Sequence, residues 1–281
     1  MSAVQTDQLG SEHFGRDDGG PTLVIAHGIL GSRRNWRTFA RKLSAQRPDC
    51  SIWTVDLRAH GDSRALRGDD TLAACADDIV AQFSAAKEVV LVGHSFGGKV
   101  MCAAAAKWPR PLRQLWVLDS ALGDREASFG GGAAEVEGVL RAALAVPIDS
   151  LDRSSAAKAL EQAGFGASLV AWMLTNVVRS DEGYRWRFDP ERVQRLLQDY
   201  FRRDLWPVFA QPRALSEHIL VRGELSARWS ESDLQWLHRS RQRADVHDLV
   251  LRDAGHWLHA DNPQGLLKLF GEYLWIDSTS P

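Results

Sequence analysis

Among the residues that could carry out chemistry, Ser95 stands in the most informative setting. Residues 93–97 read GHSFG and match the pattern G-x-S-x-G. They follow a predicted strand over residues 88–92 and precede a predicted helix over residues 98–107. A strand–turn–helix of this kind holds a serine on a tight, strained turn, where bulky neighbours would collide with the backbone. We therefore predict that Ser95 is a nucleophile rather than a structural serine in a glycine-rich turn.

A serine hydroxyl needs a base to remove its proton, and His256 is the histidine best placed to do so. It follows the last predicted strand, on a loop at the sheet edge where Ser95 is expected. We therefore predict that His256 is the general base. The histidines expected to be structural, because they flank the nucleophile or lie in strands and an early loop, are His60, His94, His218 and His247.

A metal site is a weaker reading of the same region. His259 and Asp261 lie near His256 and could be ligands, but no second cluster of ligands accompanies them. The cysteines are widely spaced in apolar surroundings and lack a C-x-x-C pair, so we expect reduced core residues at Cys50, Cys75 and Cys102. We expect neither a metal nor a cofactor.

The acid that would orient the histidine is ambiguous. Triads on parallel sheets of this kind run in the order serine, acid, histidine, and the acid commonly follows the penultimate strand. That strand is predicted at 218–222, but Ser226 stands where the aspartate is usual, and Glu224 is only one residue out of the strand. Asp119 ends the predicted strand 114–118, within reach of a histidine above the nucleophile. We predict Asp119 as the acid, with Glu224 as the alternative.

Two backbone N–H groups should stabilise the oxyanion that forms when the serine attacks a carbonyl. The Phe96 N–H lies at the start of the predicted helix, where free N–H groups and the helix dipole favour negative charge. The second donor should come from the loop after the first central strand, which reads HGILGS over residues 27–32. Ile29 is the predicted donor, with Leu30 as the alternative.

The elements that must position these residues are strands alternating with helices. From Pro21 onward, β-rich apolar runs alternate with segments of helical period, which is typical of a parallel sheet with helices on both faces. The sequence therefore predicts the α/β class, with a mostly parallel central sheet. The predicted strands are 22–26, 51–55, 88–92, 114–118, 218–222 and 246–251. Helical stripes that can cover the sheet are Trp36, Phe39, Ala40 and Leu43, and Leu72, Ala76, Ile79 and Phe83.

The alternation stops after residue 118 and resumes only near His218. The intervening segment has a mostly helical pattern, which predicts a helical lid inserted into the α/β core. The predicted domain organisation is an N-terminal segment at 1–20, a core at 21–122 and 213–276, and a lid at 123–212. Some apolar residues in and around this lid should line a pocket, and the predicted substrate-binding residues are Leu30, Trp172 and Trp257.

Composition limits the possible partners. The 281 residues are 44% hydrophobic and 25% charged, with a formal net charge of −2. This near-neutral charge predicts no general attraction to nucleic acid or anionic membranes. The N-terminus lacks a basic region followed by an apolar run, and no stretch approaches about 18 uninterrupted apolar residues. We expect a soluble, cytoplasmic protein with a small-molecule acyl ester or thioester as its partner and no membrane span; the sequence leaves organelle import and the oligomeric state open.

These motifs resemble those of one family. The strings are HGILGSRRNW, DLRAHGDS, GHSFGGKVM, LTNVVRSDEGYRWRFD and GHWLHADNPQ. Together they resemble the α/β-hydrolase serine esterases of the abhydrolase-domain-eleven branch, whose bacterial relatives hydrolyse short-chain and acyl-CoA esters. The resemblance spans about residues 21–275 and implies an α/β-hydrolase fold. Some members of that branch take their acid from the strand after the nucleophile helix, which favours Asp119. Because about twenty residues precede strand 22–26, we expect the first antiparallel strands to be shortened or partly missing.

The expected activity is hydrolysis of carboxylic esters, or of acyl thioesters, through an acyl-enzyme. A serine at the turn disfavours the dehalogenase and epoxide hydrolase chemistry of relatives that need an aspartate nucleophile. Three alternatives share the fold: a cofactor-free perhydrolase, an acyltransferase, and a ligand receptor that does not hydrolyse its ligand.

Overall fold

A computed structural model describes the chain over residues 8–16, 20–124, 132–209, 215–240, 242 and 245–274. Residues 125–131 and 210–214, which lie close to the two predicted boundaries of the lid, are outside this description.

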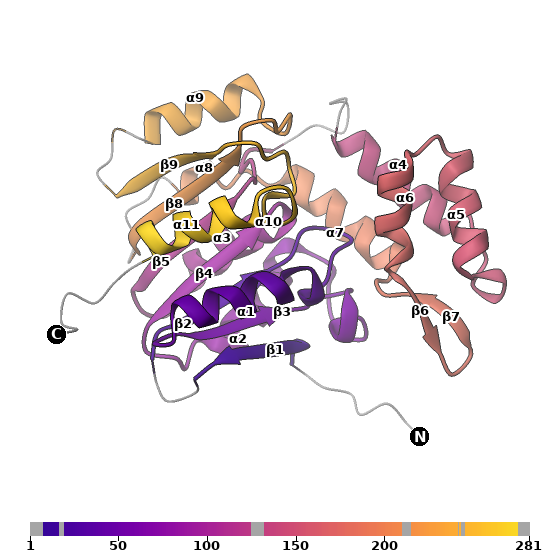
Figure 1. The fold of residues 1–281 in the computed structure, drawn as a ribbon, viewed down its shortest axis with the longest axis horizontal. Helices are drawn as coiled ribbons and strands as arrows, with labels where there is room; N and C mark the ends of the chain where they lie inside the picture. Colours follow the sequence, from indigo (N-terminus) through magenta and orange to yellow (C-terminus); the bar gives the residue numbers. More distant parts are fainter. Residues whose placement is uncertain are drawn as a thin grey trace.

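A seven-stranded sheet forms the centre of the fold (Figure 1). In spatial order its strands are β1 (Ser11–Gly15), β3 (Ser51–Val55), β2 (Thr22–Ala26), β4 (Val89–His94), β5 (Leu112–Leu118), β8 (Leu215–Gly223) and β9 (Val246–Leu251). Only the pairing of β1 with β3 is antiparallel, and the other pairs in this sheet are parallel. The predicted mostly parallel sheet is confirmed, and each predicted strand is present with its ends shifted by at most a few residues.

The edge strand β1 is absent from the sequence-based prediction. Its residues, SEHFG, are mostly half-buried and lack the alternation of apolar and polar residues that marks a strand. Its register comes from β3, since Ser11 pairs with Val55 and Gly15 with Ser51, and from the His13 ring, which lies 2.9 Å from the Ser51 hydroxyl. One antiparallel strand therefore precedes the parallel sheet.

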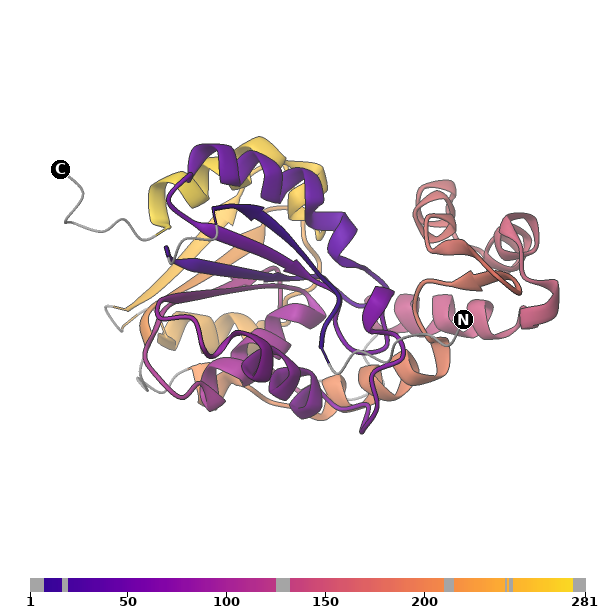
Figure 2. The same cartoon turned by 90° about the horizontal axis from the view of Figure 1, so that it is seen from below.

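Helices cover both faces of the sheet (Figure 2). On one face lie α1 (Arg37–Gln46) and α11 (Pro263–Tyr273), and on the other lie α2 (Leu72–Phe83) and α3 (Phe96–Lys107). All eight residues of the two predicted helical stripes are buried, and the two stripes belong to separate core clusters. Among the described helices, none combines the length and the apolar composition needed to cross a bilayer.

Between β5 and β8 the chain leaves the sheet and forms a group of helices beside it (Figure 1). Its main elements are α4 (Gly132–Leu144), α5 (Arg153–Gln162), α6 (Ala167–Leu174), β6 (Val177–Ser180), β7 (Gly183–Trp186), α7 (Pro190–Arg202) and α8 (Trp206–Phe209). The mostly helical pattern did not predict the antiparallel hairpin β6–β7. A two-residue turn followed by Gly183, with φ at 120°, permits this hairpin, and only glycine adopts that φ readily.

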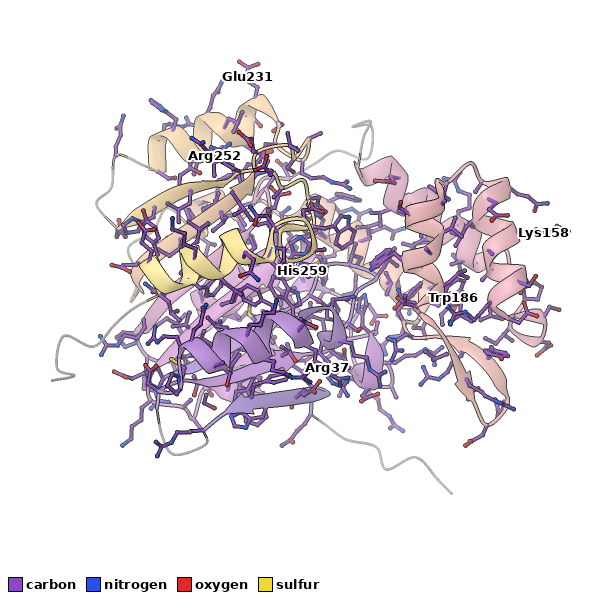
Figure 3. All side chains as sticks on the ribbon, in the orientation of Figure 1. Arg37, Lys158, Trp186, Glu231, Arg252 and His259 are labelled. Carbon is purple, nitrogen blue, oxygen red and sulfur yellow. The ribbon has the colours of Figure 1, made fainter. Side chains whose placement is uncertain are left out.

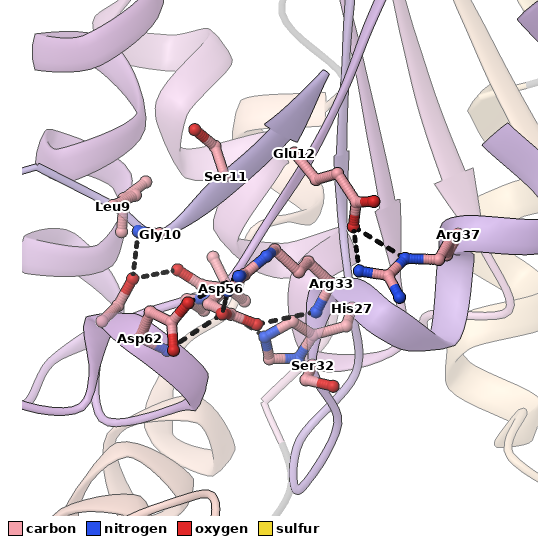
Figure 4. A network of polar contacts seen from close by, with 12 residues as sticks. Leu9, Gly10, Ser11, Glu12, His27, Ser32, Arg33, Arg37, Asp56 and Asp62 are labelled. Atoms are coloured by element: carbon pink, nitrogen blue, oxygen red, sulfur yellow. Dashed lines mark hydrogen bonds and ion pairs between the residues drawn. The ribbon is translucent and has the colours of Figure 1, made fainter. Parts of the chain in front are cut away.

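A buried polar network holds the loops at one side of the sheet (Figure 4). The Asp56 carboxylate, 1% exposed, accepts hydrogen bonds from the Arg33 backbone N–H at 2.8 Å and the Asp62 N–H at 3.0 Å. It also pairs with the Arg33 guanidinium. Ser63 donates to the Asp56 carbonyl at 2.6 Å and accepts from the Gly10 N–H at 2.8 Å. The Asp56 carboxylate thus joins η1 (Arg33–Trp36) to η2 (Gly61–Ser63), and the Ser63 hydroxyl links both to Gly10, just before β1.

We expect Asp56→Asn to lower the free energy of unfolding by up to about 3 kcal/mol, because the largely buried Arg33 guanidinium keeps only the exposed Asp62 carboxylate as its counter-charge. Urea denaturation measures the change. The control is Glu12→Gln, whose ion pair with Arg37 is 27% and 41% exposed and should contribute less than about 1 kcal/mol. Equal losses in the two variants would contradict the central role of Asp56.

Candidate active site

Ser95 occupies the strained turn between β4 and α3. Its backbone has φ 53° and ψ −120°, a conformation that residues other than glycine rarely adopt. The glycines of the motif permit this turn by close packing. A Cβ at Gly93 would lie 2.1 Å from the Gly97 carbonyl oxygen, and a Cβ at Gly97 would lie 2.6 Å from the His27 carbonyl oxygen. The G-x-S-x-G pattern is therefore a steric requirement of the turn.

The structure brings Ser95, His256 and Asp119 into one chain of hydrogen bonds. The Nε2 atom of His256 lies 3.0 Å from the Ser95 Oγ atom, and its Nδ1 atom lies 2.7 Å from Asp119 Oδ2. Asp119 directly follows β5, and His256 lies in the loop between β9 and α10 (Leu258–Asp261). In this arrangement His256 can accept the serine proton at Nε2, while Asp119 fixes the orientation of the ring through Nδ1.

Four donors surround the Asp119 carboxylate, whose side chain is 0% exposed. Oδ1 accepts from the Gly223 N–H at 3.1 Å and the Trp229 Nε1–H at 2.9 Å. Oδ2 accepts from the Ser226 hydroxyl at 2.6 Å and from His256. Burial alone would raise the pKa of Asp119, but the hydrogen bond and charge of His256, with the Ser226 and Trp229 bonds, bring that pKa below its usual value. The carboxylate is therefore held in its charged form.

The residues after β8 have roles that sequence reasoning did not assign. Ser226, which stands where an aspartate is usual, donates to Asp119. Glu224, the alternative acid, accepts a hydrogen bond from the Asp253 N–H at 3.0 Å, on the loop that leads to His256. The geometry therefore favours Asp119 over Glu224 as the partner of His256.

The predicted oxyanion donors lie beside Ser95 in buried backbone. The Leu30 N–H donates to His60 Nε2 at 3.2 Å, so the alternative donor is already engaged. In the part of the chain that is described, neither the Phe96 N–H nor the Ile29 N–H has a hydrogen-bond acceptor. Buried N–H groups without acceptors are rare, which leaves these two available to a substrate oxygen.

Two buried histidines set the shape of the loop that carries Ile29. His27 lies with Nδ1 2.7 Å from the Gly28 carbonyl oxygen and accepts from the Leu57 N–H at Nε2. His60 accepts from Leu30 in the same way, with Nδ1 2.8 Å from a carbonyl oxygen. Burial lowers the pKa of His27 to about 4 and that of His60 to about 3. Both rings therefore stay neutral and can accept backbone N–H groups.

His94 links the turn at Ser95 to the loop of His256. Its Nε2 atom lies 2.7 Å from the His256 carbonyl oxygen, so the residue next to Ser95 holds the backbone of His256. Burial, followed by the charge of His256, lowers the pKa of His94 well below its usual value. The sequence predicts structural roles for His60 and His94, and no sequence signal shows that their ring nitrogens reach the loops of Ile29 and His256.

A pocket of about 860 Å³, part of it open to solvent, leads to Ser95. The predicted substrate-binding residues Leu30, Trp172 and Trp257 all line it, and the two tryptophan rings lie 4.8 Å apart. Much of the remaining wall comes from α4, α6 and α7, including Val136, Val139, Leu169, Leu197 and Phe201. The inserted helices thus supply much of an apolar wall above the nucleophile.

His259 and Asp261, which were considered above as metal ligands, have other contacts. His259 lies in the short helix α10 (Figure 3). Its ring stacks on Trp36 with centroids 4.3 Å apart, and burial lowers the pKa of His259 to about 4. The Asp261 carboxylate accepts from the Gly255 N–H at 2.9 Å. Within the described ranges, no three His, Cys, Asp or Glu side chains are grouped as metal ligands.

A mostly parallel sheet with a serine on its strand-to-helix turn defines the class of α/β hydrolases. Residues 23–269 match the alpha/beta hydrolase family, and the chain belongs to that family. This confirms the predicted fold class.

The relatives include named lipases and esterases. The chain is 29% identical over 256 residues to the sn-1-specific diacylglycerol lipase ABHD11 of Danio rerio, covering 89% of this chain and 76% of the relative. It is 28% identical over 261 residues to the esterase YbfF of Escherichia coli, covering 90% and 92%. Its fold is similar to that of a marine microorganism esterase, with a TM-score of 0.80, 23% identity, and coverage of 95% and 99%. The two sequence relatives, a lipase and an esterase, support a carboxylic ester hydrolase.

We expect acid to destabilise the protein through its buried histidines. In the unfolded chain these side chains bind a proton below about pH 6.5, whereas His27, His60 and His259 stay neutral in the folded state to about pH 4 or below. The neutral buried histidines therefore favour the folded state fully above about pH 6.5. This contribution to the free energy of unfolding is lost as the pH falls from there toward the lowered pKa values.

From about pH 7 to about pH 5, each of these histidines should lower the free energy of unfolding by up to about 2 kcal/mol, measured by urea denaturation. His259→Gln removes one such group and should weaken the pH dependence by that amount. An unchanged free energy of unfolding across this range would contradict the prediction.

Proposed function

We propose that this protein hydrolyses carboxylic esters through an acyl-enzyme on Ser95, with His256 as the general base and Asp119 orienting it. The observation that carries the proposal is the continuous hydrogen-bonded chain from the Ser95 hydroxyl through His256 to the buried Asp119 carboxylate, at the base of an apolar pocket. A serine, a base and an orienting acid in this order form the arrangement that activates a hydroxyl for acyl transfer.

The first half of the reaction forms the acyl-enzyme. His256 Nε2 takes the hydroxyl proton as Ser95 Oγ attacks the ester carbonyl, and the carbonyl oxygen becomes an oxyanion. The N–H groups of Phe96 and Ile29 donate to this oxyanion. The imidazolium then gives its proton to the departing alcohol as the carbon–oxygen bond breaks. Asp119 stabilises the imidazolium while it exists.

The second half returns the enzyme to its starting state. His256 takes a proton from a water molecule, and the resulting hydroxide attacks the acyl carbon. The tetrahedral intermediate collapses, the proton passes back to Ser95, and the carboxylic acid leaves. Ester and water supply every atom of the products, and a thiol leaving group would follow the same steps.

The pocket wall suggests the type of substrate. Val136, Leu169 and Phe201 are apolar and come from the inserted helices, which suits an acyl chain rather than a charged group. Relatives named as esterases and lipases support a small-molecule ester as the substrate. We propose that the insertion at 123–212 acts as a lid that excludes water from Ser95, between the core segments 21–122 and 213–276.

Catalysis explains the geometry better than the alternatives do. A receptor that only binds a ligand would not need a histidine 3.0 Å from the serine hydroxyl or a charged acid behind it. Perhydrolysis and acyl transfer share the acyl-enzyme and differ only in the nucleophile that replaces water, so hydrolysis remains the leading reading.

We expect Ser95→Ala to abolish both hydrolysis of p-nitrophenyl esters and labelling by a fluorophosphonate probe. Members of a triad act as a unit, so kcat should fall by about 10³-fold or more. Turnover is followed by p-nitrophenolate release, with labelling read by mass spectrometry. Undiminished turnover by this variant would remove Ser95 from the mechanism.

Two substitutions of a carboxylate by an amide test which acid orients His256. Asp119→Asn keeps the shape but presents an amide to His256, which favours the wrong tautomer and leaves the imidazolium unpaired; we expect kcat to fall by up to about 10⁴-fold. Glu224→Gln is the matched control and should cost far less, because Glu224 binds the Asp253 N–H instead of His256. A large loss for Glu224→Gln with a nearly active Asp119→Asn would reverse the assignment.

A further inference from the structure

Arginines gather where the inserted segment crosses the core. Just after β7, the Arg187 carbonyl accepts from the Gly61 N–H at 2.9 Å, and the Asp189 N–H donates to the Ala59 carbonyl at 2.8 Å. The inserted chain therefore lies along the loop that contains η2. Arg64 donates from Nε to the Phe188 carbonyl at 3.3 Å, and Arg185 and Arg187 lie on the inserted segment just before Phe188. Arg34 lies in η1 next to Arg33, whose guanidinium binds Asp62 beside Gly61. We call Arg34, Arg64, Arg185 and Arg187 the arginine cluster, since the charges of Arg34 and Arg64 act on Arg187 and Arg185.

Most of this cluster lacks a direct counter-ion. Arg64 lies 3.6 Å from an Asp189 carboxylate oxygen. Over the described residues, no carboxylate lies within 4.0 Å of Arg34, Arg185 or Arg187.

The nearest other acids already have a partner. Asp56 and Asp62 act on Arg187 at longer range, but both are bound directly by Arg33. Arg33 and Arg64 are thus the arginines paired directly with Asp56, Asp62 and Asp189, whereas these carboxylates are not within ion-pair distance of Arg34, Arg185 or Arg187 in the described part of the chain.

The arginines of the cluster repel one another in a partly desolvated setting. Burial lowers the pKa of Arg187, and the charge of Arg34 lowers it further. Burial likewise lowers the pKa of Arg185, followed by the charge of Arg64. Repulsion of this kind weakens the association between the inserted hairpin and the core. A bound anion would neutralise part of the positive charge and so reduce this repulsion.

The cluster is connected to the active-site pocket through one residue. Asn176 accepts from the Arg187 N–H at 2.6 Å through its carbonyl, and its side-chain amide donates to the Leu30 carbonyl at 3.0 Å. Leu30 lines the pocket. One buried asparagine, Asn176, therefore links the backbone at Arg187 to Leu30 in the pocket wall.

We propose that Arg34, Arg185 and Arg187, assisted by Arg64, form a phosphate-binding site between the inserted hairpin and the core, and that it takes a phosphate group of the leaving-group part of the substrate. Guanidinium groups bind phosphate through paired, charge-assisted hydrogen bonds, and several arginines match the two negative charges of a phosphate monoester. The assignment of this phosphate to a substrate rests on the proposed ester hydrolysis.

Thermal unfolding tests the site without relying on catalysis. Inorganic phosphate at about five times its Kd should raise the Tm of the wild-type protein by about 2–4 °C, relative to chloride at equal ionic strength. Arg187→Gln should lose this rise and, without phosphate, should unfold at an equal or higher temperature because repulsion is relieved. Arg34→Gln, at an exposed position, should behave in the same way. The matched control is Arg179→Gln on β6, which should keep the full response to phosphate.

Kinetics then identify the source of the phosphate. The two substrates carry the same acyl chain, one as a p-nitrophenyl ester and the other as a coenzyme A thioester whose leaving group bears phosphates. Arg187→Gln should raise KM for the thioester by about 10-fold, with kcat little changed, since one charge-assisted contact is lost. KM for the p-nitrophenyl ester should not change.

The outcomes separate the two proposals. The phosphate site is overturned if phosphate and chloride give the same Tm, or if Arg179→Gln loses the response as fully as Arg187→Gln does. A phosphate-dependent Tm with unchanged thioester KM overturns the assignment to substrate and leaves a site for free phosphate. Absence of p-nitrophenyl ester turnover by the wild-type protein would instead count against the proposed hydrolysis, while the Tm comparison would still decide the phosphate site.

Discussion

The buried negative charge of Asp119 is the constraint on which the site's geometry depends. A carboxylate with no exposed surface is costly unless hydrogen bonds replace its lost water. Those bonds come from Gly223, Ser226 and Trp229 after β8, and from His256 after β9. Satisfying one charge therefore draws the ends of three strands together and sets the distance from His256 to Ser95.

On the other side of Ser95, neutral histidines fix the loop that carries Ile29. His27 and His60 each accept a backbone N–H at Nε2, which is possible only because burial keeps them uncharged. His94, the residue directly before Ser95, forms a hydrogen bond with the His256 carbonyl. Both the loop that carries Ile29 and the loop that carries His256 are thus tied to buried imidazole rings.

The meeting of Ser95, His256 and Asp119 is predictable from sequence because each residue follows a readable strand, and parallel strands end at one edge of a sheet. The partners of Asp119 are not predictable in this way. In the sequence, Ser226 indicates only that the expected aspartate is missing at that position. Its hydroxyl can donate to Asp119 because β5 and β8 lie side by side in the sheet. The edge strand β1 and the hairpin β6–β7 are missed for a related reason, since their short segments obtain their form from pairing rather than from a hydrophobic period.

Lys99 connects the inserted segment to the helix that begins next to Ser95. It lies four residues after Ser95 on α3, is fully buried, and donates from Nζ to the carbonyls of Gly123 at 2.7 Å, Tyr200 at 2.9 Å and Arg203 at 2.8 Å. Gly123 lies just before the insertion's helices, and the other two lie at the end of α7. Because a buried ammonium requires all of these oxygens, both ends of the insertion are held to the helix that begins at the nucleophile. Tyr200 also lines the pocket, so the wall facing the substrate is positioned by the helix that shapes the turn at Ser95.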